Sequence, residues 1–193
     1  FRAAHGAAGG DTVVGIVGRL EPYKGHEDAI RAIRRIADRV PGLYLWVVGD
    51  GSHSDYLKRA AAEQGLADRV RFLGFRRDVL SVIQCFDIQL FPSHQEGTPN
   101  TLFEALAVGN AVVASTTDGQ GEILEYGRTA LLFDTGDEAG MAGQVLRLCT
   151  DSALARELRE NALRRSGDFD GRKCIRAMEA LYEEIMDERE TAR

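Results

Sequence analysis

Residues 12–30 read TVVGIVGRLEPYKGHEDAI, which is an apolar run, a turn with two glycines and the start of a helical pattern. The run Thr12–Val17 is uncharged and rich in valine and isoleucine, which is typical of a strand buried on both faces of a parallel sheet. Isoleucines at positions 30, 33 and 36 predict an amphipathic helix over His26–Arg39. The stretch therefore predicts a strand, a loop and a covering helix, the repeating unit of an α/β domain.

The same alternation continues along the chain. Further strands are expected at Leu43–Val48, Val70–Leu73, Asp87–Phe91, Ala111–Ala114 and Leu131–Phe133. Helices are expected between them at Ser54–Gln64, Val79–Cys85, Thr101–Val108 and Glu122–Leu124, and then at Glu138–Leu148, Ala153–Arg165 and Arg172–Asp187. The predicted fold class is α/β, a doubly wound Rossmann-like parallel sheet of about six strands with helices on both faces and a helical C-terminal tail.

Composition narrows the class of protein. The net charge of −6 over 193 residues argues against nucleic-acid binding, and the three cysteines are too far apart for a zinc site. Their number and spacing are typical of reduced thiols in a cytoplasmic protein. No apolar run approaches the roughly 18 residues of a membrane helix. We interpret residues 1–10, which are rich in small residues, as a linker or the edge of a longer chain, and residues 11–193 as the domain.

The loop after the first predicted strand carries two cations. Ligands of doubly wound sheets bind beyond the carboxyl ends of the strands, where this loop lies. Gly18 permits close approach of the backbone, and Arg19 and Lys24 can point into one crevice. An arginine fork and a lysine charge near a helix start suit a pyrophosphate without a metal. The alternative is a pair of solvated surface cations.

The loop after the fourth predicted strand reads EGTPNTLFEA over residues 96–105. Thr98, Asn100 or Thr101 can cap the helix that follows, and Pro99 suits its first turn. Free amides around Asn100–Leu102 would then face the crevice as an anion cradle. Glu96 could bind a sugar, and Glu104 could bind ribose hydroxyls or merely cap its own helix.

Three other loops give weaker signals. Gly49-Asp50-Gly51 is typical of a turn, but it could also let a base or sugar approach closely. Arg76 in residues 74–78 could contact a base or a phosphate, or be solvated beside a helix-capping Asp78. Residues 118–122 could bring backbone amides to a ligand, or form only a turn. The four histidines lack metal-ligand spacing, and the position of His94 beside the Glu96 motif favours a surface or loop role over catalysis.

Five stretches in order resemble the C-terminal domain of group 1, retaining glycosyltransferases of the GT-B type. They are GRLEPYKGHEDAI (18–30), VVGDGS (47–52), VRFLGF (70–75), LFPSHQEGTPNTLFEALAVGNAVVAS (90–115) and GEILEYGRTALLF (121–133). The resemblance covers about residues 12–181. It departs from the usual pattern at Ala130, where glycine is common, and at Gly119-Gln120-Gly121-Glu122, where two adjacent glycines are common.

The resemblance implies residue roles. Arg19 and Lys24 match the pair that grips the donor diphosphate, and Glu96 matches the first glutamate of the Glu-x7-Glu motif, which contacts the transferred sugar. Glu104 matches the second, which holds the ribose, and Arg76 matches a position near the base. The stretch that lines the phosphates and sugar corresponds to Gly97, Thr98, Pro99, Asn100, Thr101 and Leu102.

The resemblance also implies what the domain binds. The donor would be a UDP-, GDP- or ADP-sugar, with no metal and no other cofactor. The N-terminal domain, which is absent from this chain, would bind the acceptor glycan, lipid or small molecule and provide any membrane contact, so the isolated domain is expected to be inactive. A GT-B epimerase or phosphorylase, or a non-catalytic nucleotide-binding module, are the alternatives.

Overall fold

The computed structural model describes residues 1–121 and 123–191, with backbone alone for Asp118 and residues 187–191. Six parallel strands form one sheet in the order β3-β2-β1-β4-β5-β6. The order confirms the predicted doubly wound topology. Successive strands are added on one side of β1 up to β3 and on its other side from β4 onward. The strands are β1 (Thr12–Val17), β2 (Leu43–Val48), β3 (Val70–Gly74), β4 (Ile88–Phe91), β5 (Ala111–Ser115) and β6 (Ala130–Phe133).

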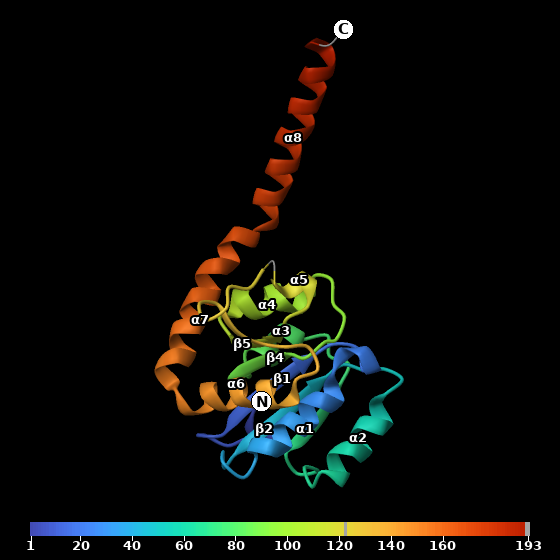
Figure 1. Cartoon of the computed structure of the whole chain (residues 1–193), viewed down its shortest axis with the longest axis vertical. Helices are drawn as coiled ribbons and strands as arrows, with labels where there is room; N and C mark the ends of the chain where they lie inside the picture. Colours follow the sequence, from blue (N-terminus) through green and yellow to red (C-terminus); the bar gives the residue numbers. More distant parts are fainter. Residues whose placement is uncertain (122, 192–193) are drawn as a thin grey trace.

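Helices cover both faces of the sheet (Figure 1). The α-helices are α1 (His26–Ile36), α2 (Ser54–Glu63), α3 (Val79–Ile83), α4 (Asn100–Val108), α5 (Asp118–Gly121), α6 (Glu138–Thr150), α7 (Ser152–Ser166) and α8 (Gly171–Thr191). Short 3-10 turns are η1 (Ala3–His5), η2 (Pro22–Lys24) and η3 (Gly167–Phe169). Two boundaries differ from the sequence prediction in an informative way.

The helix expected over 26–39 ends at Ile36 and is followed by a turn, which Arg39 N–H closes onto Ile36 O. Pro41 disfavours helical backbone at Val40, so the helix does not resume there. The helix expected at 122–124 lies earlier, at α5, and Ile123 and Leu124 are outside it. Glu122 lies outside the described residues.

The core divides at the sheet, because side chains alternate along each strand. Val14 and Ile16 of β1 share an apolar cluster with α1, α2 and α6. Val13 faces the other way, toward Trp46 and α3, and a third cluster joins α4 to β4 and β5. This packing holds the carboxyl ends of β1 and β4 side by side, with the starts of α1 and α4 above them.

The segment 1–10, expected as a linker, lies against the sheet. Arg2 forms an ion pair with Asp87 at 2.9 Å, Phe1 stacks on His5, and Ala7 is buried. Helix α8 behaves differently and extends away from the body (Figure 1). Its apolar side chains at 175, 178, 181, 182, 185 and 186 are all exposed. Within the described chain, α8 and every other helix are too short or too polar to cross a bilayer.

Candidate functional site

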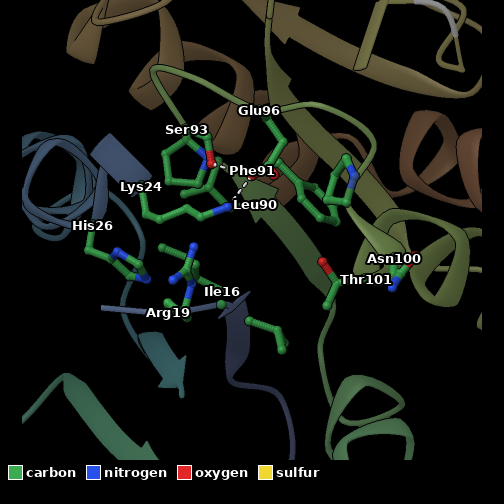
Figure 2. Close-up of a pocket in the computed structure, with 14 residues that line it drawn as sticks. Ile16, Arg19, Lys24, His26, Leu90, Phe91, Ser93, Glu96, Asn100 and Thr101 are labelled. Carbon is green, nitrogen blue, oxygen red and sulfur yellow. Dashed lines mark hydrogen bonds and ion pairs between the residues drawn. The ribbon is translucent and has the colours of Figure 1, made fainter. Parts of the chain in front are cut away.

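A cavity of about 190 Å³ lies at the carboxyl ends of β1 and β4, where doubly wound sheets bind ligands (Figure 2). The loop after β1 contributes Gly18, Arg19 and Lys24 to its wall. The loop after β4 and the start of α4 contribute Glu96, Pro99, Asn100 and Thr101. The structure therefore brings together residues from the two loops that carry the strongest sequence motifs.

Two further cavities adjoin the first one. One of about 620 Å³ is lined by Arg19, Lys24, Glu96 and Gly97, and one of about 340 Å³ by Gly18, Arg19, Arg76, Thr101 and Glu104. Arg19 lines all three cavities, so it stands where they meet. Glu104 is not in the same cavity as Lys24 and Glu96. The side chains of Arg19, Lys24, Glu96 and Glu104 thus line three adjoining cavities that one extended ligand could follow.

Two glycines set the path of the first loop. Gly49, with φ of +135°, lets the turn after β2 approach so closely that a Cβ there would lie 1.9 Å from Gly18 O. Gly25, with φ of +70°, ends η2 and packs so closely on Pro92 that a Cβ would lie 2.0 Å from its carbonyl oxygen. These close contacts fix Lys24 beside the loop after β4. Gly49-Asp50-Gly51 is therefore more than a simple turn.

Gly18 has the opposite surroundings. A Cβ there would meet no described atom within 4 Å, although Gly18 lines two of the cavities. The residue thus leaves open space where a ligand could approach the backbone.

Lys24 and Glu96 form an ion pair at the centre of the site. Lys24 Nζ lies 2.5 Å from Glu96 Oε2, and the two side chains are 16% and 15% exposed. Ser93 Oγ donates to the same carboxylate oxygen at 3.0 Å (Figure 2). Arg19 donates only to the neutral Tyr23 hydroxyl, at 2.7 Å, among the described residues. Arg19 therefore has no carboxylate partner within ion-pair distance among the described residues, whereas Lys24 is paired with Glu96.

The start of α4 differs from the expected capped helix. Pro99 is the N-cap residue, and no side chain of the described residues caps the helix. Leu102 N–H donates to Pro99 O, and the Leu102 side chain is buried in the core, so Leu102 is not part of the cradle. Thr98 is exposed and lines none of the three cavities. The amides of Asn100 and Thr101 have no acceptor in the described chain and remain as anion donors.

Glu104 is not used as a helix cap. Its Oε2 is buried without a hydrogen-bond partner among the described residues. With Pro99 as the N-cap residue, the third helical position belongs to Leu102, so Glu104 lies too far along α4 to cap its start, and Pro99 has no N–H to donate. Because a buried carboxylate oxygen without a donor is costly, this oxygen is a strong candidate for a ligand contact.

Arg76 lies at the edge of the 340 Å³ cavity and is held by Asp78. Its guanidinium donates to both carboxylate oxygens, at 2.9 and 2.7 Å. This hydrogen bonding raises the pKa of Arg76 and lowers the pKa of Asp78. Asp78 therefore orients Arg76, and its side chain does not cap α3 within the described chain.

Several residues that line the three cavities were not predicted from the sequence. His26 lines the 190 Å³ cavity, Phe75, which is 74% exposed, lines the 340 Å³ cavity, and three threonines (116, 117 and 135) line the largest one. Burial, followed by the charges of Lys24 and His53, lowers the pKa of His26 to about 4. His26 directly follows Lys24-Gly25, and this position was the available signal.

Comparisons with known proteins agree with the geometry. The model of the family "Glycosyl transferases group 1" matches residues 1–165. The lipopolysaccharide core biosynthesis glycosyltransferase LpsE of Rhizobium meliloti is 32% identical over 148 residues, which are 77% of this chain and 42% of LpsE. Glycogen synthase of Mycobacterium tuberculosis is 33% identical over 169 residues, 86% of this chain and 41% of the relative. The chain spans less than half the length of these relatives.

Solved structures share the fold. Anabaena HepE in complex with UDP superposes with a TM-score of 0.88 at 27% identity, covering 95% of this chain and 51% of HepE. The C-terminal domain of LpcC from Francisella tularensis superposes with a TM-score of 0.76 at 24% identity, covering 81% of this chain and 85% of that domain. The family match and the shared fold together place this chain among the group 1 glycosyltransferases, as a Rossmann-like half of a GT-B fold.

Proposed function

We propose that this domain binds the nucleoside-diphosphate sugar that a retaining glycosyltransferase uses as donor. The observation that carries the proposal is the convergence of Arg19, Lys24 and the free amides of Asn100 and Thr101 on one cavity. An arginine fork, a lysine charge and a helix start are the groups that bind diphosphates in proteins. HepE is a protein of the same fold, and its structure in complex with UDP supports the choice of ligand.

The diphosphate lies between Arg19, Lys24 and the start of α4 in this proposal. Lys24 exchanges its contact with Glu96 for phosphate oxygens, and Arg19 gives up only a contact with a neutral hydroxyl. The two cations and the amides then stabilise the charge that develops on the departing diphosphate. In this scheme the side chains do the work of a metal, and we propose that none is needed.

The nucleoside occupies the 340 Å³ cavity. The unpartnered carboxylate oxygen of Glu104 accepts from the ribose hydroxyls, and the base lies near Phe75 and Arg76. Because this cavity meets the diphosphate site at Gly18 and Arg19, a nucleotide can cross between them without leaving the protein surface.

The sugar extends into the 620 Å³ cavity, where Glu96 and Gly97 contact it. The bond between the anomeric carbon and the diphosphate oxygen breaks, and the acceptor oxygen bonds to the same face of that carbon. The acceptor proton passes to the departing diphosphate. An acceptor-binding domain must close this open site and position the hydroxyl, so we propose that the isolated domain binds donor but transfers little or no sugar.

Calorimetric titration tests this proposal. UDP, GDP and ADP are each compared with the matching nucleoside, and we expect at least one diphosphate to bind much more tightly than its nucleoside. Lys24→Ala should weaken diphosphate binding by about tenfold or more, since it removes a charged hydrogen bond, and should leave nucleoside binding unchanged.

Lys58→Ala is the matched control, because Lys58 lies on α2 outside the three cavities and pairs with Asp55. The proposal fails if a folded sample binds none of the three diphosphates. The role of Lys24 fails if the variant loses diphosphate and nucleoside affinity equally.

A further inference from the structure

His26 is a buried polar residue that the fold itself does not use. It is the first residue of α1, directly after Gly25, and is 2% exposed. Neither Nδ1 nor Nε2 has a hydrogen-bond partner among the described residues. Phe or Leu would fill such a position without leaving polar atoms unpaired, so the imidazole at this position requires an explanation.

The imidazole of His26 lies beside the proposed ligand site. His26 forms part of the wall of the 190 Å³ cavity, together with Arg19, Lys24 and Glu96. Figure 2 shows the imidazole extending from the start of α1 toward the side of the cavity where Arg19 and Lys24 lie. The cavity beside the ring is therefore the space that the proposed function assigns to the diphosphate.

We propose that His26 is a further donor-binding residue, whose neutral imidazole donates one N–H to an oxygen of the bound diphosphate. This inference rests on the proposed function and adds an uncharged donor to its two cations. A third cation beside Arg19 and Lys24 would repel them in the absence of ligand, whereas a neutral N–H adds a directed hydrogen bond without that repulsion. Burial and the nearby Lys24 charge keep the ring uncharged at neutral pH, with a pKa of about 4.

Removing the imidazole of His26 should affect the stability of the fold and the binding of UDP in opposite directions. His26→Phe removes two unpaired polar atoms and keeps a ring of similar size, so the folded domain should be as stable as the wild type or more stable. The same variant loses the N–H donor, so UDP binding should weaken by about tenfold, while uridine binding should not change. A residue that only fills the wall would give unchanged binding of both.

The experiment compares the full 193-residue wild-type chain with His26→Phe, His26→Gln and His26→Asn. Melting temperatures report stability, and calorimetry with UDP and uridine reports binding. His5→Phe is the matched control, because His5 stacks on Phe1 and lines none of the three cavities. Gln and Asn carry an amide donor near the two ring-nitrogen positions, and one of them should restore part of the UDP affinity.

The outcomes distinguish the two levels of the argument. If wild type binds none of UDP, GDP and ADP, the proposed function fails; if it prefers GDP or ADP, that nucleotide and its nucleoside replace UDP and uridine in the comparison. If wild type binds UDP and folded His26→Phe binds it equally well, the proposed function stands and the role of His26 is overturned. Nitrogen NMR of the wild-type imidazoles gives a second test that needs no variant: saturating UDP should shift a ring nitrogen of His26, and an unchanged resonance overturns the role.

Discussion

At the scale of single residues, His26 couples stability to pH. Its pKa is about 4 in the folded chain against 6.5 for an ordinary histidine, because burial and then Lys24 and His53 disfavour the charged form. Between these two values the unfolded chain takes up a proton that the folded chain does not. The free energy of unfolding therefore falls as pH falls through this window, by up to about 3 kcal/mol. Above pH 7 the ring is neutral in both the folded and the unfolded chain, so His26 causes no loss of stability there.

Urea unfolding at pH 7 and pH 5 checks this prediction. His26→Phe should lose less stability than the wild type between the two pH values, because it has no imidazole to protonate. His5→Phe should follow the wild type. Equal losses in wild type and His26→Phe would show that the proton does not bind at His26.

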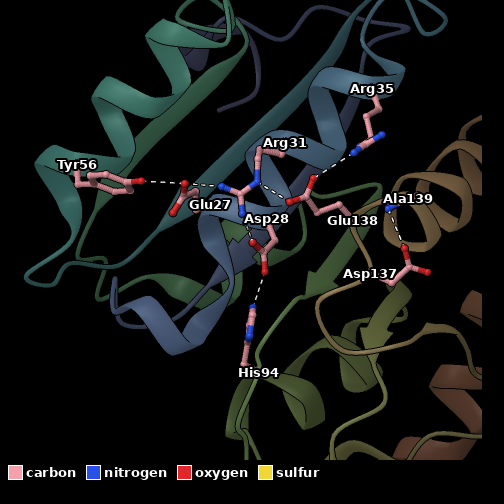
Figure 3. A network of polar contacts seen from close by, with 9 residues as sticks. All are labelled: Glu27, Asp28, Arg31, Arg35, Tyr56, His94, Asp137, Glu138 and Ala139. Atoms are coloured by element: carbon pink, nitrogen blue, oxygen red, sulfur yellow. Dashed lines mark hydrogen bonds and ion pairs between the residues drawn. The ribbon is translucent and has the colours of Figure 1, made fainter.

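At the scale of elements, α1 is tied to the loop that carries Glu96. Asp28 accepts from Arg31 on its own helix and contacts the ring of His94 in that loop (Figure 3). Arg31 also pairs with Glu138 of α6 at 2.6 Å, and His94 N–H donates to Tyr23 O at 2.8 Å. Contacts therefore hold the Lys24 and Glu96 loops together, and His94, an exposed loop residue as expected from the sequence, makes two of these contacts.

Asp28→Ala should loosen this tie. We expect faster amide hydrogen exchange over residues 93–97 and UDP binding weakened by about two- to tenfold, which corresponds to a typical coupling between neighbouring groups. The control is Asp38→Ala. Asp38 lies just after the end of α1, pairs with Arg34 of that helix, and has a side chain that is 79% exposed. Equal exchange and equal affinity in the two variants would contradict the positioning role.

The order of elements was readable from the sequence because β-strand and helix patterns differ along most of this chain. The run Thr12–Val17 and the isoleucines after it lead directly to β1 and α1. The predicted position of α5 was wrong, because a helix of four residues that include two glycines shows no helical periodicity in the sequence. The position of His26 directly after Lys24-Gly25 indicated the cavity, but its burial could not be predicted, because that burial depends on packing between the ends of β1 and β4, which are far apart in the sequence.

The residues of the site were partly predictable for the same reason. Loops after strands of a parallel sheet gather at one edge, so Arg19, Lys24 and Glu96 could be placed together. The amide of Leu102 was expected to be free, but it donates to Pro99 O and the side chain is buried, because a helix start offers both cavity-facing amides and core-facing side chains. The unpaired oxygen of Glu104 could not be foreseen without knowing that Pro99 is the N-cap residue.

At the scale of the whole molecule, α8 contributes little to the folded domain. Its described apolar side chains are exposed, and the aromatic contact nearest to it, between Phe103 and Phe169, lies before its start. A chain ending at Asp170 should therefore have a melting temperature within about 2 °C of the full chain. A chain ending at Ser166, which lacks Phe169, is the comparison and should be less stable. A large loss of stability on removing α8 alone would contradict this prediction.

The proposed site requires one ligand molecule to bind across the carboxyl ends of β1 and β4. A crystal structure of the domain with UDP tests this most directly. We predict diphosphate oxygens within hydrogen-bonding distance of Arg19 and Lys24, and ribose hydroxyls on Glu104. UDP bound elsewhere on the surface, with the Lys24–Glu96 ion pair still intact and all three cavities free of nucleotide, would contradict the account.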